Sequence, residues 1–333
     1  MTRTARATMP DLVTADSIRN AAAGLAGVVV RTPLLRAPWL EREDTEVRLK
    51  CENLQRAGAF KIRGAYTMLA RLSAAERERG VIAYSSGNHA QGVALAAGLF
   101  GVSAVVVMPT TAPAVKREGA ERLGAEVILE GTTSVERQRR AEQEAAARGL
   151  TIIPAFDHPD IIAGQGTAGM EIMDDWPEVD TIIVPVGGGG LVSGVAAWAK
   201  RVNPSCRVIG VEPEGADAMA SAIEAGGPVS IDLRPSIADG LMPVRVGDLT
   251  YAHVVELVDD VVRVTDDEIL EATRRLMKES RLVVEFSGAA TVAALIAGRA
   301  GGSRVVAILS GGNLDAGRAL DLLAARSAAG VAA

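Results

Sequence analysis

The sequence has 333 residues, of which 48% are hydrophobic and 23% are charged, with a formal net charge of -6. This composition is typical of a soluble globular protein and excludes a disordered chain, and the length predicts two domains. An acidic balance without a long Lys/Arg block excludes a nucleic-acid partner. No apolar stretch approaches the roughly 20 residues that span a bilayer, so no membrane partner is expected.

The two ends of the chain and its cysteines indicate the cellular compartment of the protein. Residues 1–10 mix Thr, Arg and Ala without a following hydrophobic region, which predicts a frayed end instead of a secretory signal. A short organelle transit peptide is the weaker alternative. The C-terminal SAAGVAA predicts a disordered tail. Cys51 and Cys206 have no paired spacing and cannot make a four-ligand zinc site, so a cytoplasmic location is expected.

Short runs rich in Val and Ile alternate along the chain with Ala/Leu/Arg/Glu stretches of helical period. Strand followed by helix, repeatedly, predicts an α/β protein with mostly parallel sheets. Runs such as AVVVM and IIVPV are apolar throughout, which is typical of strands buried on both faces. The expected strand and helix pairs are 81–84 with 89–100, 104–108 with 112–123, 126–129 with 134–148, 181–186 with 191–202, and 305–309 with 315–327, and a further strand covers 208–211.

The first candidate for chemistry, in chain order, is Lys61 in the run AFKIRGA. Its neighbours Phe60 and Ile62 are apolar, and desolvation lowers the pKa of a lysine amine, which a Schiff-base former or amine nucleophile requires. Most lysines in such a setting extend their amine to solvent instead. The residues alone leave both roles open.

Residues 85–89 follow an expected strand and begin a helix. Here Ser85, Ser86, Gly87, Asn88 and His89 bring small hydroxyls, an amide and free N–H groups to one point, which suits a carboxylate. Helix capping is the alternative, and a structural role is the commoner one for a histidine such as His89. The chain has only 3 histidines, which disfavours a histidine-based metal cluster or a Ser/His/Asp triad.

Four consecutive glycines follow the expected strand 181–186 and precede a helix. A glycine run lets the backbone approach an anion while the first N–H groups of the helix point at it, so a phosphate fits this loop. The Walker and dinucleotide-binding patterns are both absent, and a flexible turn is the alternative. The loop consists of Gly187, Gly188, Gly189 and Gly190, and the helix begins at Leu191.

A similar turn lies near the other end of the chain. The strand VVAIL ends at Ser310, and the turn SGGN leads into a helix, which exposes a hydroxyl at the edge of the sheet. Helix capping by Ser310 or Asn313 is the alternative, and it is the stronger one unless other features of the chain indicate a ligand.

Nine motifs occur together in order: AFKIRGA, SSGNHAQG, AGQGT, VPVGGGGLVSG, GVEPEGA, IADGL, LVDDV, VVEFSGAA and SGGNLD. In this combination the sequence resembles the serine/threonine dehydratase and serine racemase family, from about residue 33 to residue 322. The resemblance implies pyridoxal 5'-phosphate as cofactor and the two-lobed, three-layer α/β/α fold of the tryptophan synthase β-subunit type. It also implies a large cofactor-binding domain from residues 1–70 and 158–333, and a small mobile domain from residues 71–157.

The resemblance assigns roles to residues at matching positions. It implies that Lys61 attaches the cofactor covalently, that Phe60 lies under it, and that Asn88 bonds the phenolate oxygen of its ring. Ser310 is implied to face the pyridine nitrogen, and a hydroxyl there leaves that nitrogen largely unprotonated, which favours rapid loss of a β-substituent. The phosphate is implied to bind Gly187, Gly188, Gly189, Gly190 and Leu191, and the substrate carboxylate Ser85, Ser86, Gly87, Asn88 and His89.

The activity that the resemblance implies is that of a lyase. The freed Lys61 removes the α-proton of the substrate and the β-hydroxyl departs, giving an aminoacrylate that becomes a 2-oxo acid and ammonia. The substrate is L-threonine, L-serine or a related β-hydroxy amino acid. In the alternative, a serine racemase, Lys61 and Ser86 are the two opposing proton-transfer groups. Dehydration is the favoured prediction, because versions with this hydroxyl also occur among dehydratases.

The sequence departs from the family pattern at several positions. GVEPEGA resembles a site for magnesium or calcium, with Glu212 and the carbonyl of Ala216 as ligands, but Ala218 stands where an aspartate is expected. A surface acid is the alternative for Glu212. Phe286 replaces a common proline and Ala57 a common threonine, which predicts a pocket for a bulkier or acidic substrate. A homodimer or homotetramer is expected.

Overall fold

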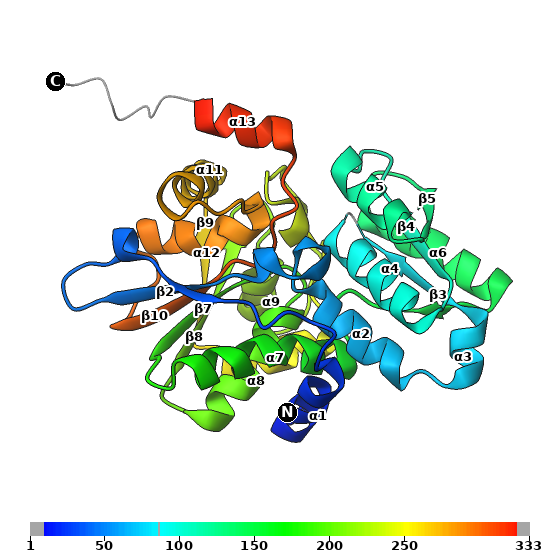
Figure 1. Ribbon diagram of the computed structural model, residues 1–333, viewed down its shortest axis with the longest axis horizontal. Helices are drawn as coiled ribbons and strands as arrows, with labels where there is room; N and C mark the ends of the chain where they lie inside the picture. Colours follow the sequence, from blue (N-terminus) through cyan, green and yellow to red (C-terminus); the bar gives the residue numbers. More distant parts are fainter. Residues whose placement is uncertain (1–9, 86, 325–333) are drawn as a thin grey trace, which may run out of the picture.

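The computed structural model describes residues 10–85 and 87–324. Two sheets organise these residues (Figure 1). The larger sheet has six strands in the order β1-β2-β10-β7-β8-β9, and every pair is parallel except β1 with β2. Its strands are β1 (Leu34–Arg36), β2 (Glu46–Lys50), β7 (Thr181–Pro185), β8 (Arg207–Pro213), β9 (Asp260–Val264) and β10 (Arg304–Ile308).

The smaller sheet has four parallel strands in the order β5-β4-β3-β6. The first three have the bounds that the apolar runs predict, while β6 is a two-residue strand that no pattern indicated. All four lie within the segment predicted to form the small domain. They are β3 (Val81–Tyr84), β4 (Ala104–Met108), β5 (Glu126–Leu129) and β6 (Thr151–Ile152).

Helices cover both faces of each sheet, so the predicted α/β architecture of three layers is confirmed. The helices are α1 (Ala15–Leu25), α2 (Lys61–Arg71), α3 (Ala74–Arg79), α4 (Asn88–Phe100), α5 (Ala114–Arg122), α6 (Ser134–Arg148), α7 (Pro159–Asp175), α8 (Gly190–Val202), α9 (Ala218–Ala225), α10 (Asp248–Leu257), α11 (Asp266–Arg275), α12 (Phe286–Ile296) and α13 (Ala316–Ala324). None of these described helices is both long and apolar enough to cross a membrane.

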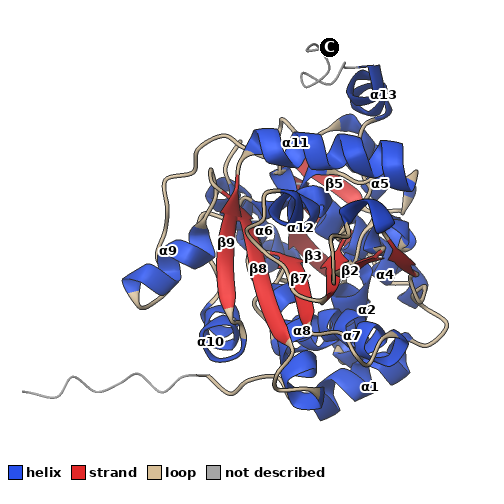
Figure 2. Cartoon of the chain, turned by 90° about the vertical axis from the view of Figure 1, so that its left-hand side faces the viewer, coloured by secondary structure: helices blue, strands red, loops and turns tan. Residues whose placement is uncertain are grey.

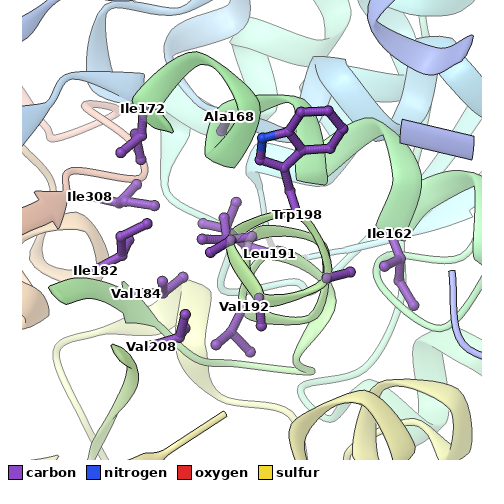
Figure 3. Packing of buried hydrophobic residues seen from close by; sticks show 14 of the residues in the cluster. Ile162, Ala168, Ile172, Ile182, Val184, Leu191, Val192, Trp198, Val208 and Ile308 are labelled. Carbon is purple, nitrogen blue, oxygen red and sulfur yellow. The ribbon is translucent and has the colours of Figure 1, made fainter. Parts of the chain in front are cut away.

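The core of the larger sheet shows why its strands are apolar throughout. Successive side chains of a strand point to opposite faces. Ile182 of β7 belongs to the cluster that contains Leu191 and Val192 of α8 (Figure 3), while its neighbour Ile183 belongs to the cluster on the other face, with residues of α11 and α12. Figure 2 shows β7, β8 and β9 side by side in this sheet. Both faces are therefore buried.

The smaller sheet is built in the same way. Val81 and Val106 face a cluster that includes α2 and α4, whereas Ile82 and Val105 face a smaller cluster with Ala141 of α6. Helix α6 begins with a capping box between Thr133 and Glu136, which satisfies N–H groups of its first turn. The predicted frayed N-terminus and disordered C-terminal tail lie almost entirely outside the described residues.

Candidate active site

A cavity of about 150 Å³ lies where the carboxyl ends of β7 and β10 meet the N-termini of α2, α4 and α8. Ligands of parallel α/β sheets bind at such ends. The structure brings together in it most of the residues that the motifs predicted. Those that line the cavity are Phe60, Lys61, Ser85, Asn88, His89, Gly187, Gly188, Gly189, Gly190, Leu191 and Ser310. Of the others, Gly87 donates its N–H to Ser85 Oγ at 3.1 Å, and Ser86 lies outside the described residues.

Lys61 is the first residue of α2, and its amine is turned into the cavity. Its Nζ donates to the carbonyl oxygen of Ala155 at 2.9 Å. Burial lowers the pKa of the Lys61 amine to about 8, because removal from water disfavours the charged form. The backbone around it is fixed by the N–H of Phe60, which donates to the carbonyl of Ser310 at 3.1 Å. The residue is a buried amine that can be neutral near physiological pH.

The glycine loop precedes α8, a helix of 13 residues. Gly189 has a φ of 95°, which glycine adopts without strain, and a Cβ at Gly188 would overlap the ring of Phe156. Within the described residues, the N–H groups of positions 188–191 donate to no acceptor. These free donors and the helix dipole make the loop a site for a phosphate or another anion.

A second set of contacts supports this loop from behind. The hydroxyl of Thr250 donates to the carbonyl of Gly188 at 2.7 Å. Thr250 lies in the first turn of α10, whose N–H groups donate to the carboxylate of Asp157 at 3.0 to 3.1 Å. The segment 155–157 therefore contacts Lys61 through Ala155, the glycine loop through Phe156 and α10 through Asp157.

Asn88, the first residue of α4, is held by two partners. Its Oδ1 accepts from Asn313 Nδ2 at 2.9 Å, and its Nδ2 donates to Glu285 Oε1. These two bonds fix which way the amide faces. Glu285 is 3% exposed and was not predicted as a site residue, although it belongs to the motif VVEFSGAA.

His89 is buried, and its Nε2 lies 2.9 Å from the carbonyl oxygen of Ile153. Burial, together with the charge of Lys61, lowers the pKa of His89 to about 3, so the imidazole is neutral at physiological pH. A carbonyl only accepts, so the proton is on Nε2 and Nδ1 is left as an acceptor. A neutral imidazole that is hydrogen-bonded to the backbone fits a structural role for His89, which was the alternative to substrate binding.

Comparison with known proteins identifies the family. Residues 25–311 match the family model described as pyridoxal-phosphate dependent enzyme. The chain belongs to this family. It is 44% identical over 306 residues to an L-threonine ammonia-lyase of Thermotoga maritima, covering 91% of this chain and 76% of the relative. It is 40% identical over 307 residues to an L-threo-3-hydroxyaspartate ammonia-lyase of a Pseudomonas species, covering 91% and 96%.

Among solved structures, maize serine racemase matches with a TM-score of 0.87 and 39% identity, covering 93% of this chain and 97% of that one. The resemblance inferred from the ordered motifs, and the fold class with it, are thereby confirmed. Pyridoxal phosphate also fits the residues of this pyridoxal-phosphate-dependent enzyme. The free N–H groups of the glycine loop supply donors for the phosphate, and Lys61 supplies an amine of lowered pKa in the same cavity.

The predicted cation site at Glu212 and Ala216 has a different arrangement. The two oxygens of Glu212 accept backbone N–H groups of Met219 and Ala220 at 2.8 and 2.9 Å, and burial raises the pKa of this carboxyl to about 8. Asp217 accepts from a guanidinium of β9 at 2.8 Å. Among the described residues there is no group of three His, Cys, Asp or Glu that can hold a metal ion. The residues in this arrangement do not fit magnesium or calcium, and no step is assigned to either ion.

Lys116 of α5 is a site residue that sequence reasoning missed. Its Nζ lies 2.6 Å from Asp239 Oδ2 and 3.3 Å from Glu285 Oε2. Burial opposes its charge, but the carboxylates of Glu285 and Asp239 raise the pKa of Lys116 above its ordinary value. This ion pair joins the smaller sheet's layer to two loops of the larger sheet. In the run PAVKREGA the lysine looks like an ordinary exposed helix charge, so no local signal indicated it.

Two of the departures from the family pattern, Phe286 and Ala57, contact or adjoin residues around the cavity. Phe286 is the first residue of α12, follows Glu285 and lines a larger cleft of about 710 Å³ that shares residues with the cavity. Ala57 has a φ of 57°, in the left-handed region, and its carbonyl accepts from Asn313 Nδ2 at 3.0 Å. Their predicted effect on substrate choice stays a prediction. Tyr84, Ser134 and Arg137 also line the cavity and were not predicted.

Proposed function

We propose that this enzyme is a pyridoxal-phosphate-dependent ammonia-lyase that converts a β-hydroxy amino acid, such as L-threonine or L-serine, to a 2-oxo acid and ammonia. One observation carries the proposal: Lys61 and the free N–H groups at the start of α8 meet in one cavity. The similarity to the ammonia-lyases of Thermotoga maritima and of a Pseudomonas species supports it.

The residues have complementary tasks in this proposal. When bound, pyridoxal phosphate withdraws electrons from the α-carbon of the substrate and makes its proton more acidic. Lys61, whose pKa is near 8, takes that proton as a neutral amine. The glycine loop binds the phosphate, Asn88 and Ser310 orient the ring, and residues 85–89 bind the substrate carboxylate.

The proton that Lys61 acquires has a use in the next step. Departure of the β-hydroxyl requires a proton, and the Lys61 ammonium carries one after taking the α-proton. The α-proton and the hydroxyl leave together as water. Water is added back when ammonia is released, so the overall change converts one amino acid to one 2-oxo acid and one ammonia.

The colour of the protein tests the cofactor part of the proposal. The purified enzyme should show the absorption of protein-bound pyridoxal phosphate, and borohydride should fix the cofactor to the chain. Lys61→Ala should bind the cofactor without this fixation, and Lys278→Ala, which changes a lysine outside the cavity, should behave as the parent. Protein that stays colourless with added pyridoxal phosphate overturns the proposal.

A panel of serine, threonine, 3-hydroxyaspartate and phenylserine, assayed for 2-oxo acid release, tests the reaction. The racemase alternative has its own support in the likeness to maize serine racemase. Chiral chromatography of serine in the same reactions separates the two functions. Interconversion of the serine enantiomers faster than pyruvate release favours the racemase, with Lys61 and Ser86 as its two proton-transfer groups.

Assembly and compartment form part of the same proposal. Val30, Leu54 and Val283 are 43%, 49% and 49% exposed. The residues on either side of Leu54 connect them: Asn53 donates to the carbonyl of Val283, and the Gln55 amide accepts from the N–H of Val30 and donates to its carbonyl. An exposed apolar group of this kind supports a homodimer or homotetramer, which light scattering will measure. Both described cysteines are free and buried, in keeping with the reducing cytoplasm. The small domain at 71–157 is proposed to move when substrate binds.

A further inference from the structure

Arg263 of the edge strand β9 lies beside the predicted cation site. It is the register partner of Glu212 on β8, so the two side chains lie on the same face of the sheet. Its Nε donates to Asp217 Oδ2 at 2.8 Å, and its Nη2 donates to Glu224 Oε1 at 2.7 Å. Asp217 directly precedes α9, and Glu224 lies in the last turn of that helix. One guanidinium therefore holds both ends of α9 to the edge of the sheet.

The guanidinium brings positive charge to the place where a divalent cation was predicted. Magnesium and calcium bind through several oxygen ligands, mainly carboxylates and carbonyls. Here the carboxylate of Asp217 accepts from Arg263, and the buried Ala218 supplies a methyl group where an aspartate is expected. A second cation beside the guanidinium would be repelled by it. The carboxylates of this site are therefore served by a cation that belongs to the chain itself.

Helix α9 packs behind the glycine loop. Met219 in its first turn is fully buried, and a Cβ at Gly189 would lie 2.8 Å from Met219 Cε. Glu212 fixes the same turn, because its carboxylate accepts the N–H of Met219 at 2.8 Å. The groups that hold α9 in place therefore also support the loop whose free N–H groups suit a phosphate.

The turn between β8 and α9 has a second connection to the cavity. The carbonyl of Gly215 accepts the N–H of Arg234 at 2.9 Å, and the carbonyl of Glu214 accepts from Arg234 Nη2 at 2.6 Å. The chain continues from Arg234 into residues 239–243, which line the cavity that contains Lys61. A displacement of this turn would reach the cavity through both the glycine loop and residues 239–243.

We propose that Arg263 is a positioning residue that takes the place of a divalent cation, so that this enzyme binds pyridoxal phosphate and keeps its stability without magnesium or calcium. Arg263 acts through α9 and touches neither cofactor nor substrate. A guanidinium stays protonated at every physiological pH and cannot dissociate, so the support that it gives does not depend on the supply of cations. The inference holds for any reaction at the cavity, because it concerns cofactor binding and unfolding.

The first test uses the parent enzyme after treatment with EDTA. Titration with pyridoxal phosphate gives the dissociation constant of the cofactor, and thermal unfolding gives Tm. Millimolar magnesium or calcium should change neither value by more than sodium chloride of equal ionic strength does, which corrects for screening. A rise in Tm or a tighter cofactor complex that is specific to either divalent cation overturns the inference.

The second test removes the charge of Arg263. Arg263→Met should weaken pyridoxal phosphate by about 10-fold, because loss of its charge-assisted hydrogen bonds loosens α9. Arg263→Lys keeps a cation and should recover most of this affinity. The control is Arg304→Met, which removes a half-exposed arginine at the start of β10, paired with Asp180, and should bind the cofactor as the parent does. Parent-like affinity in Arg263→Met without added cations overturns the inference.

The third test converts the site into one that needs a metal ion. The double variant Arg263→Met with Ala218→Asp removes the guanidinium and supplies the expected acid, so millimolar calcium should raise its Tm by about 3 °C. The matched double variant Arg263→Met with Ala218→Asn has nearly the same shape without the added charge, and calcium should leave its Tm unchanged. Equal responses of the two double variants to calcium overturn the replacement of a cation by Arg263.

Discussion

Two buried arginines, Arg63 on α2 and Arg137 on α6, differ in what surrounds their charge. Arg63 is fully buried, and its guanidinium donates to Glu52 at 2.8 Å through two nitrogens and to Glu171 at 2.7 and 2.8 Å. Among the described residues, the guanidinium of Arg137 has only the carbonyl of Thr132 as an acceptor. Folding itself supplies the counter-charges of Arg63, whereas no described carboxylate lies within ion-pair distance of Arg137. The comparison teaches that burial alone does not assign a role to a charge, because the role depends on the partners that the fold places around it.

Lys61 shows a third way to bury a basic group. It has no carboxylate partner among the described residues, and its lowered pKa allows it to exist as a neutral amine. Arginine lacks this option because its pKa is too high. The three residues therefore respond differently to substitution, and the following experiments compare those responses.

The largest loss of stability is expected for Arg63→Met. This change leaves the fully buried carboxylate of Glu52 without its guanidinium partner, while Glu171 keeps Lys50 at 2.6 Å. It should lower the free energy of unfolding by about 3 to 5 kcal/mol. Urea denaturation measures the loss. The control is Arg31→Met, which removes a half-exposed arginine paired with Asp175 and should cost less than about 1 kcal/mol. Equal losses in the two variants would contradict the structural role of the Arg63 network.

Lys116→Met should have an intermediate effect. It leaves the carboxylate of Glu285, which is 3% exposed, without its cation, and a stranded buried charge of this kind costs about 2 to 3 kcal/mol. Thermal and urea unfolding measure it. Asp239→Asn is the matched change, because it removes the more exposed partner and leaves Lys116 with Glu285. A larger loss for Asp239→Asn than for Lys116→Met would place the important contact at Asp239.

Lys61→Met should change how stability depends on pH in protein without cofactor. The pKa of Lys61 is about 8 in the folded state against 10.5 for an ordinary lysine, so between these values the unfolded chain holds a proton that the folded chain has lost. The unfolding free energy of the parent should therefore rise with pH across this window relative to Lys61→Met. Paired urea titrations at pH 7.5, 9 and 10.5 measure the difference. A difference that falls with pH would show that the amine is stabilised as a cation.

The smallest effect on stability is expected for Arg137→Met. No described carboxylate is left unpaired by the change, so the free energy of unfolding should stay within about 0.5 kcal/mol of the parent or increase. Urea denaturation measures it. A loss of more than about 2 kcal/mol would mean that Arg137 has a structural partner, and the contrast with Arg63 would fail.

The fold was predictable because its signals are local. Three strands of the smaller sheet have the predicted bounds, since their apolar runs are short and end at turns. The helix expected at 112–123 is shorter, because Pro113 caps it at Ala114. Strands β1 and β2 were missed, because their polar and charged residues give no continuous apolar run.

The site was predictable where a motif carries the chemistry within a few residues. Lys61, Asn88 and the glycine loop follow from such motifs and meet in the cavity. No motif indicated Lys116 or Arg137 as site residues. Their roles depend on which carboxylates the fold places near them. Their surroundings are set by tertiary packing, which no local pattern expresses.

The segment 155–157 sets the spacing of the site. One carbonyl holds the amine of Lys61, the next ring packs against the glycine loop, and the following carboxylate anchors α10 behind that loop. Three consecutive residues thus contact both the reactive amine and the glycine loop, and they help to set the distance between the two. Because these residues are consecutive, a substitution that shifts one of them would displace both the amine of Lys61 and the glycine loop.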